Sequence, residues 1–388
     1  MSTLPRRGFL LQAAAPIAGL LAGHTARNVG LTGSDAIDPR EERAMTAAAE
    51  AFMAEYDVPA LSVAIARADN LVYVSALGMA DRAGEVLTPR HRFRIASVSK
   101  PITSVAIMSL IEQGKLSLSE RIFGQDAVLG FDYGKRPYRE HVEEITVEHL
   151  LTHTCGGWSN GGPDPDPMFT NPQMDHRALI SWTLDNIPIR HTPGEQYAYA
   201  NFGFCLLGRV VEKRSGVGYE QFVRQNVLRK CAISGMEIAG NRREDRKAME
   251  TVYYGQGGES PYGMQVARMD AHGGWLATPT DLVRLLVRVD GFASKPDLLK
   301  PETLRAMTTA PPNNPGYARG WMVNPANNWW HNGSLPGTTS IMVRTSGGMC
   351  WAALTNTRKP QSQIGLDLDR LVWNMVGKVS AWPAIDLF

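Results

Sequence analysis

Ser97 and Lys100 form a Ser-x-x-Lys motif at the head of an apolar run. Residues three apart on a helix share a face, so the amine of Lys100 can reach the hydroxyl of Ser97. An unprotonated amine in that place removes the hydroxyl proton, which makes the serine a nucleophile for acyl transfer. Because Pro101 is tolerated in a first helical turn, we expect a helix over residues 102–113 that begins near Ser97 and is capped by Gly114.

The Ser-x-x-Lys motif on its own carries little information. At roughly 5% usage for each residue type, about one such motif is expected by chance in a chain of 388 residues, and an ordinary amphipathic helix would explain it. Two further motifs follow along the chain. These are Tyr199-Ala-Asn201, the only Tyr-x-Asn of the sequence, and His331-Asn-Gly333, which precedes a strand-like run.

The three motifs, in this order, resemble those of the penicillin-recognising serine hydrolases. This superfamily includes class C β-lactamases, D-alanyl-D-alanine carboxypeptidases, D-aminopeptidases and β-lactamase-like esterases. The resemblance covers most of the chain, and structural context has to confirm such motif matches. Further stretches similar to family landmarks lie at residues 93–97, 149–154, 193–194, 274–278, 281–282 and 331–337.

The resemblance implies the roles of the reacting groups. In this family the serine attacks a carbonyl carbon, and water later hydrolyses the covalent acyl-enzyme. Ser97 would be the nucleophile, with Lys100 and Tyr199 as the base system. A lysine can act as a base only if burial or positive neighbours lower its pKa from the usual value of about 10. The sequence does not show such a shift, so the choice between Lys100 and Tyr199 stays open.

The resemblance also implies a set of substrate-binding groups. Asn201 would hydrogen-bond both the substrate and Lys100. The backbone N–H groups of Ser97 and of Ser334, which directly follows Gly333, would form the oxyanion hole.

His331 stands where class C β-lactamases carry a lysine, and Asn332 where they usually carry a threonine. That lysine and threonine help to hold a substrate carboxylate, and an imidazole that is mostly neutral at pH 7 holds one less firmly. Efficient β-lactam hydrolysis is therefore not expected, whereas His-x-Gly also occurs in D,D-peptidases, D-aminopeptidases and esterases of the superfamily. Trp330 is the best candidate for an apolar pocket wall. Together these features predict a preference for uncharged acyl groups.

Strand-like runs lie near both ends of the chain, at residues 61–66, 71–77, 320–324, 329–331, 339–345 and 349–356, with Gly347-Gly348 as a hairpin turn. Helices are expected at 41–55 and 363–376, and in between at 147–151, 175–185, 202–214, 219–228 and 279–289. Pairing the two strand groups would bury both apolar sets. The sequence therefore predicts an α+β fold of the β-lactamase/transpeptidase-like type: a mostly antiparallel sheet flanked by N- and C-terminal helices, with an inserted mainly helical lobe.

The domain organisation follows from these elements. We expect residues 1–26 to be a twin-arginine-type export signal and residues 27–388 to be a single β-lactamase-like catalytic domain. Its sheet lobe would comprise about residues 40–115 and 311–388, and its helical lobe about residues 116–310. Two long loops, at 158–172 and 242–263, are expected to wall the pocket.

The first residues predict export. The stretch from Arg6 to Leu10 fits the twin-arginine pattern and precedes a moderately apolar run too short to span a membrane; an ordinary secretory leader or an uncleaved anchor is the alternative. Without Arg6 and Arg7 the formal net charge of +2 falls to near zero, so nucleic-acid binding is not expected. We expect a bacterial protein that is periplasmic or secreted, with no stable membrane span after signal removal.

Other features point weakly to different chemistry. The stretch from Gly157 to Gly161 matches Gly-x-Ser-x-Gly around Ser159, but the nucleophile elbow needs a strand before it and a helix after it, and the sequence favours neither. His149 and His153 have a metal-binding spacing but lack an intervening glutamate and an evident third ligand. Disulfide pairing cannot be read from the cysteines, whose spacing matches no zinc or redox motif: Cys155, Cys205, Cys231 and Cys350.

The sequence thus predicts an exported serine hydrolase that needs no cofactor or metal and forms an acyl-enzyme on Ser97. Its substrate would be a small ester, amide or peptide. Carboxylesterase activity and D-alanyl-D-alanine carboxypeptidase-like activity on D-amino-acid amides are nearly equal expectations. A β-lactamase proper and a non-catalytic penicillin- or cell-wall-binding protein are the alternatives. The natural substrate and the oligomeric state stay open.

Overall fold

The computed structural model describes residues 36–161 and 164–388. The expected export signal at residues 1–26, with Arg6 and Arg7, lies outside the described residues. Within the part of the chain that the structure describes, no helix has the length and apolar character needed to cross a membrane.

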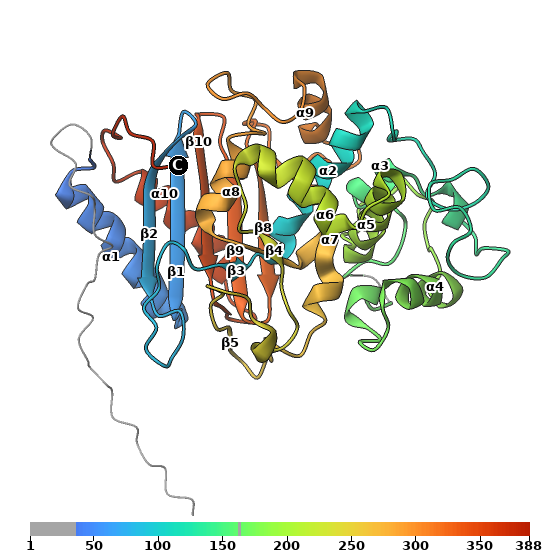
Figure 1. Ribbon diagram of the computed structural model, residues 1–388, viewed down its shortest axis with the longest axis horizontal. Coiled ribbons are helices and arrows are strands. Elements are labelled where there is room, and N and C mark those ends of the chain that lie inside the picture. The colour runs from blue at the N-terminus through green and yellow to red at the C-terminus, as the bar shows by residue number, and fades with distance from the viewer. Residues whose placement is uncertain (1–35, 162–163) are drawn as a thin grey trace, which may run out of the picture.

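Six strands form an antiparallel sheet in the order β2-β1-β10-β9-β8-β7. The N- and C-terminal strands join where β1 pairs with β10, from Leu61 opposite Thr355 to Arg67 opposite Met349. The prediction that both ends of the chain close one sheet is therefore confirmed (Figure 1). The strands are β1 (Ala60–Arg67), β2 (Asn70–Gly78), β7 (Met322–Val323), β8 (Trp329–Leu335), β9 (Thr338–Arg344) and β10 (Met349–Thr355).

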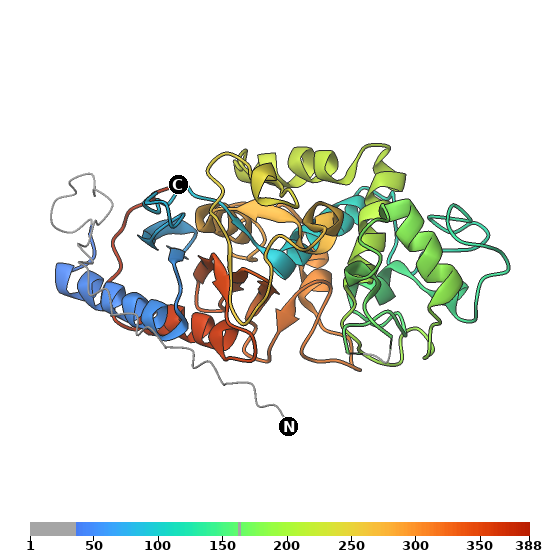
Figure 2. The same ribbon diagram turned by 90° about the horizontal axis from the view of Figure 1, so that it is seen from below.

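The two terminal helices, α1 (Pro39–Tyr56) and α10 (Ile364–Val376), pack together against one face of this sheet (Figure 2). Alternate residues of a strand point to opposite faces, so Ile341 and Val343 of β9 face these helices while Met342 faces the other core. The predicted helices at 41–55 and 363–376 and the layer they form are confirmed.

The opposite face of the sheet is covered by α8 (Pro279–Leu286), which packs against β1 and β10. The start of α8 follows from its sequence. The Thr278 side chain accepts a hydrogen bond from the backbone N–H of Asp281, the Asp281 carboxylate accepts one from the N–H of Thr278, and Pro279 fits the first turn. This helix belongs to the range expected for the helical lobe but lies on the sheet.

The helix α2 (Ser99–Glu112) lies at the centre of the helical side of the molecule, in contact with α5, α6 and α7. Its residues from Ser99 to Met108 are all buried, as expected for a helix that is packed on every side. The surrounding helices are α3 (Val147–Leu151), α4 (His176–Asn186), α5 (Asn201–Ser215), α6 (Tyr219–Val223), α7 (Asp270–Gly273) and α9 (Pro301–Thr308).

Some elements differ from the prediction. The helix expected at 219–228 ends as α6 at Val223 and continues as one π-helical turn, Arg224–Leu228. The helix α9 was not predicted. Several short strands were not predicted either, because two or three residues give no periodicity to detect. These strands are β3 (Phe93–Arg94), β4 (Glu237–Ile238) and β6 (Trp275–Ala277), which form a three-stranded sheet, and β5 (Tyr254–Gly255) with β11 (Thr357–Arg358).

All four cysteines are buried free thiols. Burial raises the pKa of Cys155 to about 11 and of Cys205 to about 12, as for small apolar side chains rather than reactive thiols. Cys205 and Cys350 both belong to the main hydrophobic core.

Candidate active site

Ser97 lies in a tight turn, Ala96–Val98, between β3 and the start of α2. Ala96 has a left-handed backbone (φ 47°), which costs a non-glycine residue about 1 kcal/mol and is held here by its surroundings. The turn rests on β8 at Gly333, where any side chain would collide with the Ile95 carbonyl oxygen and the Ser340 hydroxyl. Glycine at this place lets the strand approach the serine.

Lys100 is completely buried, and its amine contacts three oxygen atoms. Its Nζ lies 3.1 Å from Ser97 Oγ, 2.7 Å from Asn201 Oδ1 and 3.0 Å from the carbonyl oxygen of His272. Burial holds the pKa of Lys100 well below its usual value, against the opposing attraction of Asp166. An uncharged amine has two hydrogens, which the amide and carbonyl oxygens can accept, so its lone pair is left for the Ser97 hydroxyl.

The orientation of Asn201, the first residue of α5, is fixed from behind. Its side-chain nitrogen donates to Asp166 Oδ2 and to Asn160 Oδ1, each at 3.0 Å, and its backbone N–H donates to the same carboxylate at 3.3 Å. The amide oxygen must therefore face Lys100. Burial raises the pKa of Asp166, and its hydrogen-bond donors oppose that rise.

Tyr199 is half-buried beside the lysine, with Lys100 Nζ 4.8 Å from its ring centre. Burial raises the pKa of the Tyr199 hydroxyl, and the neighbouring Ser97 side chain opposes the rise. The two candidate bases are therefore shifted in opposite directions: the lysine towards the neutral amine and the tyrosine towards the neutral phenol. The structure brings Ser97, Lys100, Tyr199 and Asn201 together as one site.

His331 is also nearby, with its ring 6.4 Å from that of Tyr199. It is 1% exposed, and both of its ring nitrogens have protein partners: Tyr317 Oη at 3.1 Å and the Asn332 carbonyl oxygen at 2.6 Å. Burial and the charge of Lys100 lower the pKa of His331 to about 3. The imidazole of His331 is therefore an uncharged, buried part of the wall of the site. It does not present a positive charge at the surface of the site.

Gly333 and Ser334 lie at the edge of a cavity of about 420 Å³ beside the end of β8. The exposed Ser334 hydroxyl accepts a hydrogen bond from Arg358 Nη1 at 3.2 Å, and Arg358 Nε donates to Glu259 Oε2 at 2.9 Å. The charge of Arg358 is thus already paired at the rim of this cavity.

The placement of Trp330 differs from the prediction. It faces the cluster formed by α1 and α10, whereas its neighbours Trp329 and His331 point to the opposite face of β8. Successive strand residues alternate in direction, so adjacency to His331 puts Trp330 on the wrong side for a pocket wall.

The alternative motifs have structural roles. α3 precedes Ser159, and the residues described after it, 160–161 and 164–166, contain no helix, so these described residues lack the strand and helix that an elbow requires. His149 shares a capping box with Thr146 at the start of α3. His153 Nε2 contacts the hydroxyl of Tyr317 at 3.1 Å.

Several site residues were missed by sequence reasoning. Asp166 and Asn160 orient Asn201, and Tyr317 connects His153 with His331. Asn160 belongs to the Gly-x-Ser-x-Gly match, which indicates a nucleophile elbow. His153 belongs to the histidine pair, which has a metal-binding spacing. No local motif marks Asp166 or Tyr317.

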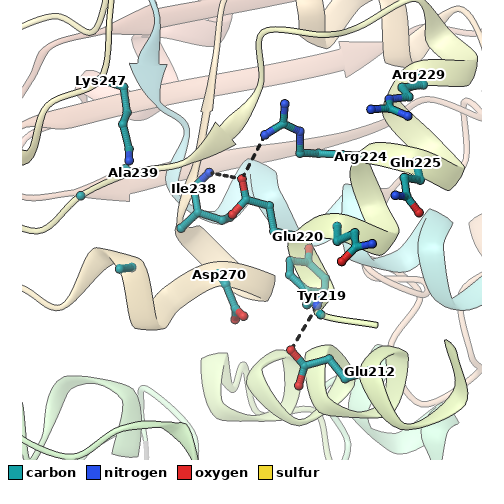
Figure 3. A pocket seen from close by; sticks show the side chains of 14 residues that line it. Glu212, Tyr219, Glu220, Arg224, Gln225, Arg229, Ile238, Ala239, Lys247 and Asp270 are labelled. Carbon is teal, nitrogen blue, oxygen red and sulfur yellow. Dashed lines mark hydrogen bonds and ion pairs between the residues drawn. The ribbon is translucent and has the colours of Figure 1, made fainter. Parts of the chain in front are cut away.

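A second cavity, of about 830 Å³, lies away from these residues between α6, the π-helical turn and β4 (Figure 3). Its glutamates already accept hydrogen bonds: Glu220 from the backbone N–H of Ile238 at 3.2 Å, and Glu212 from that of Tyr219 at 3.1 Å. The nucleophile and its lysine lie outside this cavity, so we assign catalysis to the Ser97 site.

A serine, a buried lysine and a tyrosine at the junction of an antiparallel sheet and a helical region define the penicillin-recognising serine hydrolases. Comparison with known proteins agrees with this class. The Beta-lactamase family model matches residues 45–372, and the chain belongs to that family. Its fold is the β-lactamase/transpeptidase-like fold, as predicted.

Individual relatives are distant. The chain is 24% identical over 313 residues to penicillin-binding protein 4* of Bacillus subtilis (strain 168), covering 73% of this chain and 64% of that protein. It spans about three fifths of the length of the curated relatives it matches. Among solved structures, it is similar to an octameric penicillin-binding protein homologue from Pyrococcus abyssi, with a TM-score of 0.68, 25% identity and coverage of 87% and 79% of the two chains. D-amino acid amidase from Ochrobactrum anthropi SV3 shares the fold, with a TM-score of 0.71, 20% identity and coverage of 87% and 98%.

Proposed function

We propose that this protein is an exported serine hydrolase that cleaves small esters or D-amino-acid amides through an acyl-enzyme on Ser97. The observation that carries the proposal is the Lys100 amine, which lies 3.1 Å from Ser97 Oγ with its other contacts limited to two acceptors. This is the arrangement of a neutral amine poised to accept a proton. The amide part of the proposal is supported by the fold shared with D-amino acid amidase.

The reaction then proceeds in two halves. Lys100 takes the proton of Ser97 as the serine oxygen attacks the substrate carbonyl, and the backbone N–H groups of Ser97 and Ser334 stabilise the oxyanion. The proton passes to the leaving alcohol or amine, with the Tyr199 hydroxyl beside Ser97 as the carrier. Water next attacks the acyl-enzyme carbonyl and gives a proton to Lys100. The bond between the acyl carbon and Ser97 Oγ then breaks, the proton returns from Lys100 to Ser97 Oγ, and the carboxylic acid is released.

The acyl group is proposed to be uncharged near the cavity beside β8. His331 offers no positive charge to the Ser97 site, because its nitrogens are occupied and its pKa is lowered to about 3. Arg358 is paired with Glu259.

The test is parallel incubation of the mature protein with p-nitrophenyl butyrate and with a fluorescent penicillin, following product release and intact mass. Ser97→Ala should abolish ester turnover and any adduct. Ser159→Ala is the matched control, since it removes the serine of the competing motif, and it should retain both. Rapid penicillin turnover would instead identify a β-lactamase. If the parent protein shows no turnover and forms no adduct, that result would contradict catalysis and favour a binding protein.

A further inference from the structure

A chain of three buried side chains runs along the wall of the site. The hydroxyl of Tyr317 lies 3.1 Å from His153 Nε2 and 3.1 Å from His331 Nε2. All three residues are at most 2% exposed. The acyl-transfer steps described above assign no role to Tyr317.

The proton positions on these three side chains follow from the contacts of the two histidines. The backbone N–H of Ala200 donates to Nδ1 of His153 at 3.1 Å, so neutral His153 carries its hydrogen on Nε2 and donates it to Tyr317. At the other end, Nδ1 of His331 lies 2.6 Å from the Asn332 carbonyl oxygen, which can only accept. His331 therefore carries its hydrogen on Nδ1, and its Nε2 accepts the hydroxyl hydrogen of Tyr317.

The three hydrogen-bonded side chains connect the two sides of the site. Ala200 is the residue between Tyr199 and Asn201 at the start of α5, whereas His331 belongs to β8 of the main sheet. The same side chains enclose Tyr199, whose ring centre lies 4.3 Å from that of His153 and 6.4 Å from that of Tyr317.

The three hydrogen-bonded side chains also stay uncharged beside the lysine. Burial lowers the pKa of both imidazoles and raises that of the Tyr317 hydroxyl, and any positive charge on Lys100 lowers the pKa of each histidine further. A hydroxyl that donates to His331 and accepts from His153 satisfies both rings without adding charge.

We propose that Tyr317 is a positioning residue of the acyl-transfer site, whose hydroxyl fixes the proton positions of His153 and His331 and thereby holds Tyr199 in place over Lys100. Its effect on catalysis rests on the proposed function, whereas the proton order can be measured without any substrate. The Tyr317→Phe substitution would keep the ring and leave both Nε2 atoms without a partner.

The first measurement is a ¹⁵N NMR spectrum of the histidine side chains, assigned with His153→Gln and His331→Gln. In the parent protein, His331 should show hydrogen on Nδ1 only and His153 on Nε2 only. Tyr317→Phe should move the Nε2 signal of His331 downfield, because an unprotonated ring nitrogen loses its donor. Tyr197→Phe is the matched control: its ring lies 5.8 Å from Tyr317 and 6.0 Å from His153, and the change should leave both histidine signals in place.

The second measurement is ester hydrolysis by the same variants. Tyr317→Phe should lower kcat about 10- to 100-fold with KM within about twofold, because the hydroxyl orders catalytic groups and is buried away from substrate. The proposal is overturned if the parent shows the opposite proton order, if Tyr317→Phe leaves the His331 signal or kcat unchanged, or if Tyr197→Phe has the same effects. The parent spectrum alone tests it if Tyr317→Phe does not fold. If the parent protein gives the expected spectrum but forms no acyl-enzyme, the proposed function is contradicted instead.

Discussion

The amide oxygen of Asn201 lies 2.7 Å from Nζ of Lys100, closer than the hydroxyl oxygen of Ser97 at 3.1 Å. An amide oxygen carries only a partial charge, so it orients the amine without stabilising the ammonium form as a carboxylate would. The nearest carboxylate, Asp166, lies one side chain further away and contacts Asn201 instead. This ordering keeps the lysine usable as a base.

The first prediction concerns the pH dependence of Asp166→Asn. The carboxylate of Asp166 raises the pKa of Lys100, so its removal should lower that pKa. Activity is lost when Lys100 takes up a proton as the pH falls, and the acid limb of kcat/KM should therefore move to lower pH. The measurement is p-nitrophenyl butyrate hydrolysis across the acid range. Asp164→Asn is the control, because that carboxylate pairs with Arg190, and a limb that stays in place in Asp166→Asn would contradict the argument.

The second prediction concerns stability. The pKa of Lys100 is depressed in the folded protein, so between that pKa and the unfolded value of about 10 the unfolded chain binds the extra proton, and folding becomes more favourable as pH rises. The free energy of unfolding of the parent minus that of Lys100→Met should increase by up to about 1.4 kcal/mol per pH unit in this window. Urea unfolding of both proteins at several pH values measures the difference. Parallel pH curves would show that the folded lysine is charged.

The third prediction concerns the contact between β8 and the nucleophile turn. Gly333→Ala forces a methyl group against the Ile95 carbonyl oxygen and the Ser340 hydroxyl, so the turn that carries Ser97 has to move. We expect a loss of about 1–3 kcal/mol in stability and at least a tenfold loss of acylation rate. Gly347→Ala, in the β9–β10 turn, meets no atom closer than 4.0 Å and should keep both properties. Full activity in Gly333→Ala would contradict the close approach.

The fourth prediction concerns acyl-group charge. Glu259→Gln should free the guanidinium of Arg358 at the rim of the cavity beside β8. KM for p-nitrophenyl hydrogen glutarate should then fall about tenfold, while KM for the uncharged butyrate ester stays the same. The double variant Glu259→Gln/Arg358→Gln should lose the gain. Turnover of the glutarate ester by the parent protein as fast as the butyrate ester would refute the proposed preference for uncharged groups.

The sequence predicted the parts of the site that lie within short motifs. Ser97 and Lys100 are one helical turn apart, and Tyr199 and Asn201 flank the start of one helix, so local spacing is enough to place them. The sheet was predicted for a similar reason, because β-rich runs at both ends of the chain leave few ways to bury their apolar residues.

The remaining parts depend on contacts between distant segments. Asp166 reaches Asn201 from a loop, and Tyr317 reaches both histidines from a segment before β7, so no spacing rule links them. Trp330 is a different case, since the alternation of strand residues already assigns it to the face opposite His331. The π-helical turn after α6 also has no sequence signature that periodicity detects.

The pairing of β1 with β10 has a consequence for biosynthesis. During translation β1 and β2 emerge from the ribosome long before the partner of β1, which extends from Met349 to Thr355. Until then one edge of β1 presents unpaired backbone groups that can join strands of other chains. Truncations that end before Met349 should therefore aggregate even though they retain Ser97, Lys100 and Tyr199, and the sheet should complete only after Thr355 has been made.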